Sequence, residues 1–235
     1  METEKINPKE IVKNGYNKIA QTYQDWENHL EENTNRVYYL KKLYQLVHNN
    51  SKKKEKEANI KHILDIGCGS GLWTQKIKDN IPLSTIQAID ISETQIQLAK
   101  KNVPLLSDAF QCQDIMSFSN NNHSFDVIIG LFSFIHLSQE DQLLIFPKLY
   151  QWLNPDGLLL INLSPFEHPC LLNPNWLGAE MFWSSLGEDK YKQIIEELGF
   201  TILEWSIVEE QEDDVRIPFL WIICQKKVDE NKNER

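Results

Sequence analysis

The sequence predicts an α/β fold with a mostly parallel sheet, helices on both faces and a helical cap at the N-terminus. After residue 60, short apolar runs alternate with segments of helical periodicity, which is typical of strands joined by crossover helices. Residues 158–163 and 219–224 are almost continuously apolar, as expected for strands covered on both faces. A length of 235 residues suits one domain, and we assign residues 1–235 to it.

The N-terminal cap is predicted over residues 1–50. Asn33 or Thr34 is suited to begin a helix there. The apolar residues that recur at helical spacing after this point are Val37, Leu40, Leu43, Tyr44 and Val47. A more irregular helix is expected before it. Residues 51–59 are dominated by Lys and Glu, so we interpret them as a solvated connector.

The core is predicted over residues 60–225. Its candidate strands are residues 62–66, 84–91, 108–115, 125–132, 157–163, 200–207 and 219–225. Its candidate helices are residues 72–78, 93–102, 140–152 and 188–198. Ser92 followed by Gln95 is a capping-box pattern that places the start of the second helix. Residues 208–218 are turn-like and too short for a crossover helix, so the last two strands are expected to pair antiparallel at one edge. Residues 226–235 form a polar tail.

The charge balance argues against nucleic acid as a partner. The chain carries 24 basic and 34 acidic residues, a net charge of −10, which repels polyanions. Its 4 cysteines are scattered without a CxxC pair, which is typical of a reducing compartment, and we expect neither disulfides nor a metal site. No run is apolar and long enough to span a membrane. We therefore expect a cytoplasmic protein without a membrane partner.

A glycine-rich segment follows the first predicted strand and precedes a helix. Gly67, Gly69 and Gly71 allow a tight turn and a close approach of the backbone to a nucleotide. The dinucleotide pattern GxGxxG is not matched, because Leu72 stands where its last glycine is needed. Asp65 lies just before the loop, where a carboxylate at about 4 Å would repel a pyrophosphate by roughly a few kcal/mol. S-adenosylmethionine, which is cationic and has no phosphate, suits this loop better.

Two further carboxylates end the next two predicted strands. Asp90 stands where a carboxylate can accept hydrogen bonds from both hydroxyls of a ribose. Asp114 is followed by Ile115 and Met116, and this segment offers an acceptor and a backbone donor to an adenine edge. Met116 and Ile91 are suited to sandwich the adenine faces. Each aspartate alone also fits a turn or a helix cap, but together they mark the edge where open α/β sheets bind ligands.

Five motifs follow one another over residues 63–163: LDIGCGSG, AIDIS, CQDI, FDVIIGLFSFIHL and LNPDGLLL. In this order they resemble the class I S-adenosylmethionine-dependent methyltransferases. The resemblance implies a Rossmann-like, seven-stranded sheet with an antiparallel final strand, and S-adenosylmethionine as the cofactor. It also implies that Asp65 and the glycines surround the methionyl part, with Asp90 at the ribose and Asp114 near the adenine amine.

The N-terminal segment YNKIAQTYQDW resembles the opening of free-standing, small-molecule members of that family, in which a leading helix covers the cofactor. This resemblance adds Tyr16 and Tyr23 as neighbours of the cofactor or the substrate. The full set of predicted cofactor-binding residues is Tyr16, Tyr23, Asp65, Ile66, Gly67, Cys68, Gly69, Gly71, Asp90, Ile91, Asp114, Ile115, Met116 and Leu131.

Methyl transfer from a sulfonium needs few catalytic groups. It is an in-line displacement, so much of the acceleration comes from holding the acceptor in line within a dry pocket. A hydroxyl or ammonium acceptor must also lose a proton, and His136, just after the fourth strand, is the best-placed base. His136 equally fits a packing role beside the cofactor. Tyr23 is a second catalytic candidate, with orientation of the substrate as its milder role.

Residues 164–187 form a long insertion, which we predict to be a lid over a small-molecule acceptor. Trp176, Phe182 and Trp183 are its candidate substrate contacts, although packing of the insertion onto the sheet explains them equally well. Two other function hypotheses stay open: a non-catalytic partner subunit that binds the cofactor and, less favoured, an NAD-dependent oxidoreductase. The sequence leaves the acceptor molecule, the acceptor atom and the oligomeric state open.

Overall fold

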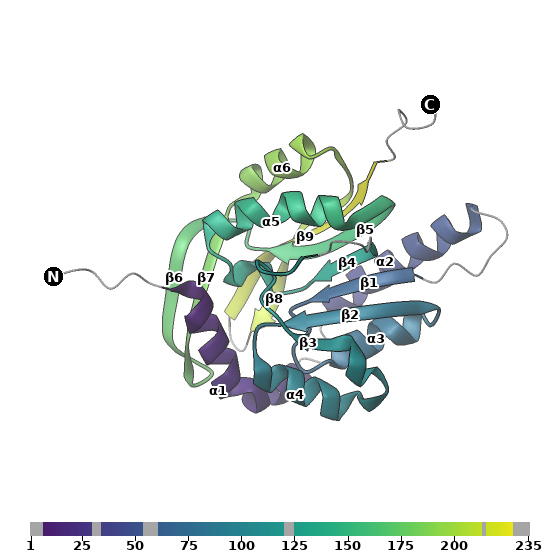
Figure 1. Cartoon of the computed structure of the whole chain (residues 1–235). Helices are drawn as coiled ribbons and strands as arrows, with labels where there is room; N and C mark the ends of the chain where they lie inside the picture. Colours follow the sequence, from purple (N-terminus) through teal and green to yellow (C-terminus); the bar gives the residue numbers. More distant parts are fainter. Residues whose placement is uncertain (1–6, 30–33, 54–60, 120–124, 213–214, 228–235) are drawn as a thin grey trace.

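A seven-stranded sheet with the strand order β3-β2-β1-β4-β5-β9-β8 forms the centre of the molecule (Figure 1). The computed structural model describes residues 7–29, 34–53, 61–119, 125–212 and 215–227. The strands of the sheet are β1 (Lys61–Ile66), β2 (Ser84–Asp90), β3 (Phe110–Cys112), β4 (Phe125–Gly130), β5 (Leu153–Leu163), β8 (Phe200–Glu212) and β9 (Val215–Lys226). Each corresponds to one of the strands that the apolar runs predicted.

The strands from β3 to β5 pair with their neighbours in parallel. Strand β9 pairs antiparallel with both β5 and β8, which confirms the predicted antiparallel final strand. The last hairpin is longer than expected, because β8 continues to Glu212 and β9 begins at Val215. The acidic side chains of residues 208–218 predict a turn, whereas most of these residues belong to β8 and β9. Charged side chains are tolerated there because β8 is an edge strand.

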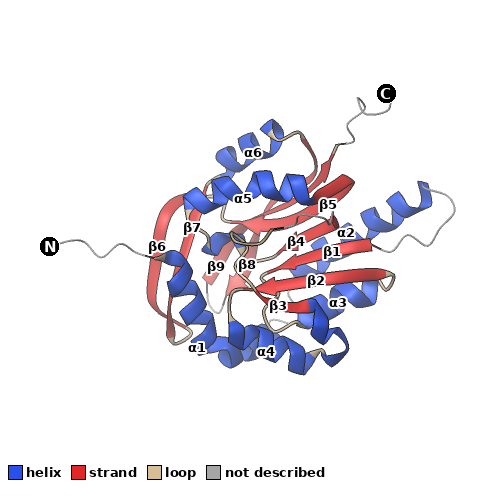
Figure 2. Ribbon diagram, in the orientation of Figure 1, coloured by secondary structure: helices blue, strands red, loops and turns tan. Residues whose placement is uncertain are grey.

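Helices cover both faces of the sheet (Figure 2). They are α2 (Thr34–Lys53), α3 (Leu72–Asn80), α4 (Glu93–Asn102), α5 (Gln139–Trp152) and α6 (Glu188–Glu197). Leu64 of β1 is buried in one apolar cluster with α5 and α6, whereas the adjacent Ile63 is buried in another with α2 and α3. Successive side chains of a strand point to opposite faces, so these two neighbours identify the two helical layers.

The N-terminal segment divides into two helices with different positions. Helix α1 (Pro8–His29) packs against the insertion and against α4. At the start of α4, the Ser92 hydroxyl donates a hydrogen bond to the side-chain oxygen of Asn17 at 2.8 Å. Helix α2 instead buries its apolar stripe, including Leu40 and Leu43, against the sheet. The predicted cap therefore divides in two: α1 packs on the insertion, whereas α2 is part of the helical layer on the sheet.

The insertion at residues 164–187 contains a second sheet, which differs from the loop that we expected. Strands β6 (Glu167–Trp176) and β7 (Ala179–Leu186) pair antiparallel. They are joined at Leu177 and Gly178, whose φ angles of 50° and 98° are those of a turn that suits the twist of a hairpin. Prolines within residues 167–176 obscured this strand in the sequence, and they are tolerated because β6 is mostly exposed. Figure 1 shows α1 alongside this hairpin.

Several predicted boundaries shift by a few residues. Helix α4 begins directly after Ser92, whose hydroxyl oxygen accepts the Gln95 N–H at 3.1 Å. In a complete capping box the Gln95 side chain would accept the Ser92 N–H. Here the Asp90 carboxylate accepts it instead, at 2.8 Å. Asn33 and residues 54–59 of the connector lie outside the described residues, whereas residues 51–53 belong to α2.

Two shorter elements follow the predicted strands near the site. The segment Pro104–Ala109 is a 3-10 helix, so the third strand is shorter than the predicted residues 108–115. A 3-10 turn, η2 (Phe134–His136), follows β4. Within the described ranges, no helix combines the length and the apolar composition needed to cross a membrane.

Candidate functional site

A cavity of about 280 Å³ lies at the carboxyl ends of β1, β2 and β4 and beside the segment that follows β3. We call it the strand-end cavity. This is the edge at which open α/β sheets bind ligands. The predicted cofactor-binding residues that line it are Tyr16, Tyr23, Ile66, Gly67, Gly69, Asp90, Ile91, Asp114, Ile115, Met116 and Leu131. His136 lines it as well. The fold therefore brings these predicted residues together from several distant segments of the chain.

The glycines of the loop have two different roles. Gly67 and Gly69 have φ angles of 71° and 53° and line the strand-end cavity. A Cβ on Gly67 would lie 2.5 Å from the Cβ of Ser133, so only glycine allows this close approach. Gly71 lines none of the cavities described here, and a Cβ there would lie 2.9 Å from the Phe110 ring. Gly71 therefore serves the packing of the loop.

Asp90 is the last residue of β2 and one of the buried charged residues. One of its carboxylate oxygens accepts the Gly69 N–H at 3.0 Å, and the other accepts the Ser92 N–H at 2.8 Å. Burial raises the pKa of Asp90 to about 6, although these N–H groups counteract part of the effect. Asp90 thus fixes the glycine loop to the start of α4 and retains lone pairs for a ligand in the cavity.

Asp65 lies behind the glycine loop rather than in the strand-end cavity. Its carboxylate accepts a hydrogen bond from the Thr74 hydroxyl at 2.6 Å, and burial raises its pKa to about 6. It lines a small space of about 40 Å³, the loop cavity, together with Cys68, Glu27 and Arg36. Gly67, Gly69, Leu131 and Tyr23 line both cavities, so the two adjoin.

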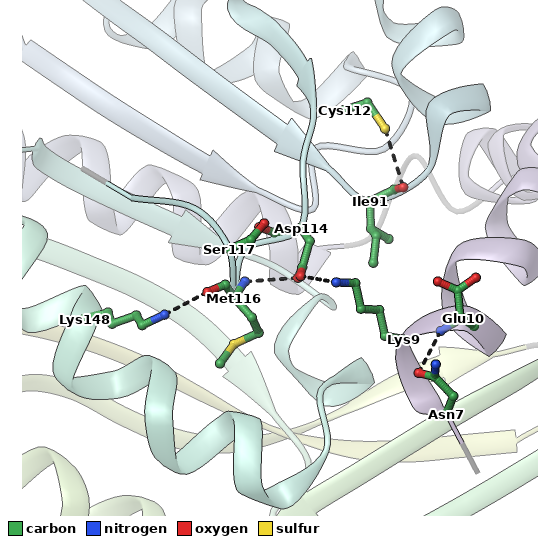
Figure 3. Close-up of polar contacts among 9 residues, drawn as sticks. All are labelled: Asn7, Lys9, Glu10, Ile91, Cys112, Asp114, Met116, Ser117 and Lys148. Carbon is green, nitrogen blue, oxygen red and sulfur yellow. Dashed lines mark hydrogen bonds and ion pairs between the residues drawn. The ribbon is translucent and has the colours of Figure 1, made fainter. Parts of the chain in front are cut away.

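Asp114 follows β3 and is held on both of its oxygens (Figure 3). One oxygen accepts the Met116 N–H at 3.0 Å, and the other forms an ion pair with Lys9 of α1. Lys148 donates to the Met116 carbonyl at 2.8 Å and holds the same segment from α5. Lys9 also lines the strand-end cavity. The sequence prediction missed Lys9, because nothing in its local pattern distinguishes it from the other lysines of α1.

Two polar side chains of the strand-end cavity have buried atoms without a hydrogen-bond partner among the described residues. They are both amide atoms of Gln95 and the hydroxyl of Ser133. A buried polar group without a partner costs about 1–3 kcal/mol, unless a ligand or water satisfies it. The cavity also has apolar walls at Ile91 and Met116. This combination fits a nucleoside, whose faces are apolar and whose edges carry donors and acceptors.

His136 lies in η2, between the strand-end cavity and a second cavity. Its Nδ1 lies 2.8 Å from the Phe182 carbonyl oxygen and its Nε2 lies 2.9 Å from the Tyr16 hydroxyl. Burial lowers the pKa of His136 to about 4, and burial also raises the pKa of Tyr16 well above its usual value. Both side chains are therefore neutral near pH 7, and Tyr16 donates to His136.

Tyr23 lines all three cavities, at the point where they meet. Burial and the negative charge of Glu27 raise the pKa of its hydroxyl far above the usual range, so it stays protonated. Arg36, in the first turn of α2, forms an ion pair with Glu27 at 2.6 Å. The sequence prediction missed this pair, because it depends on how α1 packs against α2.

The second cavity, of about 430 Å³, lies between α1, the β6–β7 hairpin and the β8–β9 hairpin. We call it the aromatic cavity. Trp176 and Trp183 line it, as predicted, and Tyr16, Tyr23 and Trp26 of α1 complete its aromatic wall. Phe182 differs from the prediction: it lines neither large cavity and its side chain is buried, while its carbonyl group binds His136.

Residues 63–157 match a protein family described as "Methyltransferase domain". The malonyl-[acyl-carrier protein] O-methyltransferase of Halalkalibacterium halodurans is 30% identical over 158 residues, which are 66% of this chain and 55% of that protein. The phosphoethanolamine N-methyltransferase of Plasmodium falciparum is 28% identical over 152 residues, which are 64% of this chain and 50% of that protein. The chain thus spans about half the length of these curated relatives.

Solved structures share the fold. The magnesium protoporphyrin IX methyltransferase of Synechocystis PCC 6803, crystallised with bound SAM, has a TM-score of 0.63 and 16% identity, with 96% of this chain and 100% of that chain covered. The N-methyltransferase NodS of Bradyrhizobium japonicum has a TM-score of 0.59 and 19% identity, with 84% and 99% covered. At these identities the likeness concerns the fold alone.

Proposed function

We propose that this chain is a class I S-adenosylmethionine-dependent methyltransferase that transfers a methyl group from S-adenosylmethionine to a small-molecule acceptor by in-line displacement. The match of residues 63–157 to the methyltransferase-domain family supports this proposal. One observation carries the proposal. The strand-end cavity is lined by Asp90 and Asp114 and adjoins the aromatic cavity at Tyr16 and His136, which line both. This arrangement supports a nucleoside site that adjoins an acceptor site.

Asp90, Asp114 and Gln95 would hold the adenosine part of the cofactor. The lone pairs of Asp90 that remain beside its two backbone contacts would accept the ribose hydroxyls. Asp114 would accept the adenine amino group once Lys9 has moved aside. Ile91 and Met116 provide apolar walls for the adenine faces, and the Gln95 amide supplies donors and acceptors that the chain leaves unused.

The loop cavity suits the amino-acid part of the cofactor. It is lined by two carboxylates, Asp65 and Glu27, and one guanidinium, Arg36. An α-ammonium group is attracted to the carboxylates and an α-carboxylate group to the guanidinium. These residues lie next to Gly67 and Gly69, so the reactive end of the cofactor would lie near Tyr23 and Leu131. Arg36 and Glu27 are proposed binding residues that the sequence did not suggest.

The bound cofactor supplies a methyl group that its positively charged sulfur makes electrophilic. The residues of this chain contribute orientation, a dry environment and proton handling. The Tyr16 hydroxyl donates a hydrogen bond to Nε2 of His136, so the lone pairs of its oxygen remain able to accept a hydrogen bond from the acceptor. The acceptor's proton would then pass to the Tyr16 oxygen as the Tyr16 proton moves to Nε2. Tyr23, protonated throughout, would act in orientation rather than as a base.

A calorimetric titration with S-adenosylhomocysteine, S-adenosylmethionine and NAD tests the donor site. The proposal predicts binding of the first two at one site per chain and no heat from NAD. Heat from NAD alone would support the oxidoreductase hypothesis instead. A protein that binds the cofactor but forms no S-adenosylhomocysteine with any member of a broad panel of small acceptors would support the partner-subunit hypothesis.

A further inference from the structure

The aromatic cavity has a wall of five neighbouring rings. Trp176 lies at its centre, with ring centroids 5.5 Å from Trp183, 5.8 Å from Tyr23 and 6.1 Å from both Tyr16 and Trp26. The faces and edges of such rings exclude water and contact apolar groups. Their faces also attract a cation, and Trp does so most strongly.

Carboxylates are the charged groups that β8 adds to this cavity. Glu210 and Glu212 line it, and Glu210 is only 4% exposed. Burial raises the pKa of Tyr16, and the negative charges of Asp90, Glu27 and Glu212 add to this effect. The field at the Tyr16–His136 contact is therefore that of an acidic pocket.

Arg36 is a cationic side chain that lines this cavity, but it already has partners and is assigned above to the α-carboxylate of the cofactor. Arg36 forms the ion pair with Glu27 at 2.6 Å, and its guanidinium carbon lies 4.6 Å and 4.7 Å from the ring centroids of Trp73 and Phe132. Burial lowers the pKa of His168 and of His136, so neither ring adds positive charge near pH 7. A carboxylate acceptor would thus be repelled by Glu210 and Glu212, whereas an ammonium group would be attracted by both acids and by the aromatic faces.

Resting on the function proposed above, we propose that the acceptor is an organic amine whose apolar body lies in the aromatic cavity. It binds as an ammonium ion with its nitrogen toward Tyr16. The ammonium gives one proton to the Tyr16 oxygen as the Tyr16 proton passes to His136. The freed nitrogen lone pair forms the bond to the methyl carbon while the carbon–sulfur bond breaks, and that electron pair stays on sulfur. The positive charge moves from sulfur to nitrogen, where Glu210, Glu212 and the rings stabilise it.

Three probes that share a phenethyl group test the charge preference: phenethylamine, 2-phenylethanol and 3-phenylpropionate. Each is titrated calorimetrically into the full chain, with and without saturating S-adenosylhomocysteine. We expect phenethylamine to bind about tenfold or more tightly than the alcohol, and the carboxylate to give no detectable heat. Equal or tighter binding of 3-phenylpropionate would overturn the proposal. The S-adenosylhomocysteine titration reports on the donor site separately, so failure of the proposed function is distinguishable from failure of the acceptor class.

Charge-removing variants locate the preference. Glu210→Gln and Glu212→Gln are each expected to weaken phenethylamine binding about three- to tenfold and to leave 2-phenylethanol unchanged. Glu209→Gln is the matched control, because Glu209 lies on the same strand but is exposed and pairs with Arg216. An unchanged S-adenosylhomocysteine affinity shows that a variant is folded. If Glu210→Gln does not fold, the Glu212→Gln variant alone tests the proposal. Unchanged amine selectivity in a folded Glu212→Gln protein refutes the proposal.

Discussion

The hydroxyl of Tyr16 lies 2.9 Å from Nε2 of His136, and this contact joins helix α1 to η2 between the two large cavities. The carbonyl oxygen of Phe182 lies 2.8 Å from Nδ1 and can only accept a hydrogen bond, so Nδ1 carries the ring proton. Nε2 is therefore unprotonated and accepts the hydrogen bond from Tyr16. A histidine with a pKa of about 4 is a weak base, and its effect on an acceptor passes through the tyrosine. The pair thus acts as one unit.

Tyr16→Phe and His136→Ala are expected to lower kcat by similar factors of about 10- to 100-fold and to leave the Kd for S-adenosylhomocysteine within about twofold. The reason is that both variants break the same hydrogen bond without removing a proposed cofactor contact of comparable strength. Steady-state kinetics and calorimetry measure the two effects, with the exposed Tyr38→Phe as a control. Parallel losses in turnover and cofactor affinity would assign the pair a purely structural role.

Asp90→Ala is expected to weaken S-adenosylhomocysteine binding by about 1–3 kcal/mol, roughly 5- to 150-fold, because ribose hydroxyls lose their buried acceptor. The change also removes the contacts to the Gly69 and Ser92 N–H groups, so part of the loss comes from a less ordered loop. Asp79→Ala provides a control on the exposed side of α3. Unaltered affinity in Asp90→Ala would contradict the ribose assignment.

Cofactor affinity is expected to rise with pH between about 5 and 7. Burial raises the pKa values of Asp65 and Asp90 to about 6, so in the free protein both carboxyls are protonated below this pH and ionised above it. The ionised forms attract the ammonium group and accept the ribose hydroxyls, so binding is favoured above pH 6 and is coupled to proton release near it. Calorimetry in buffers of different ionisation enthalpy measures this release. An affinity that is constant from pH 5 to 8 in folded protein argues against both roles.

Lys9→Ala is expected to speed cofactor association, because the Lys9 ion pair occupies the Asp114 oxygen proposed to meet the adenine amine. The ion pair is half exposed on the lysine side, so its removal is expected to change the free energy of unfolding by less than about 1 kcal/mol. Stopped-flow tryptophan fluorescence measures the association rate, with exposed Lys18→Ala as a control on the same helix. A slower association in Lys9→Ala would show that the lysine recruits the cofactor rather than blocks it.

Gly15→Ala tests how α1 is seated. Within an exposed helix this change would stabilise the fold by about 1 kcal/mol. Here a Cβ would lie 2.7 Å from the Glu180 carbonyl oxygen and 2.8 Å from the Met181 side chain, so α1 must move away from β7. We expect a lower Tm and faster proteolysis of the β6–β7 hairpin, in contrast to exposed Asn14→Ala. A Tm at or above that of the original protein contradicts this packing.

The strand positions and helical layers could be predicted because each depends on a local pattern. Local patterns of a few residues predict these features. They are the alternation after residue 60, the loop glycines and Ser92 before α4. The β6–β7 hairpin could not be recognised, because Pro169, Pro174 and a run of exposed positions hide the alternation of β6. Its pairing is set by the turn at Leu177 and Gly178 and by contact with α1.

The site was predictable to the extent that it follows strand ends. Asp90 and Asp114 needed only the strand assignment, whereas the Lys9 and Arg36 contacts arise from how α1 and α2 fold back onto the sheet. Phe182 illustrates a further limit. Aromatic composition alone marked both it and Trp183, but neighbouring side chains of β7 point to opposite faces, and only Trp183 lines the aromatic cavity.

A crystal structure with bound S-adenosylhomocysteine tests the central claim most directly. The account predicts adenine near Asp114, the ribose hydroxyls on Asp90 and the sulfur facing Tyr16 and His136 at the entrance of the aromatic cavity. A ligand bound outside the strand-end cavity, or one whose sulfur is separated from the aromatic cavity by the body of the cofactor, would contradict it.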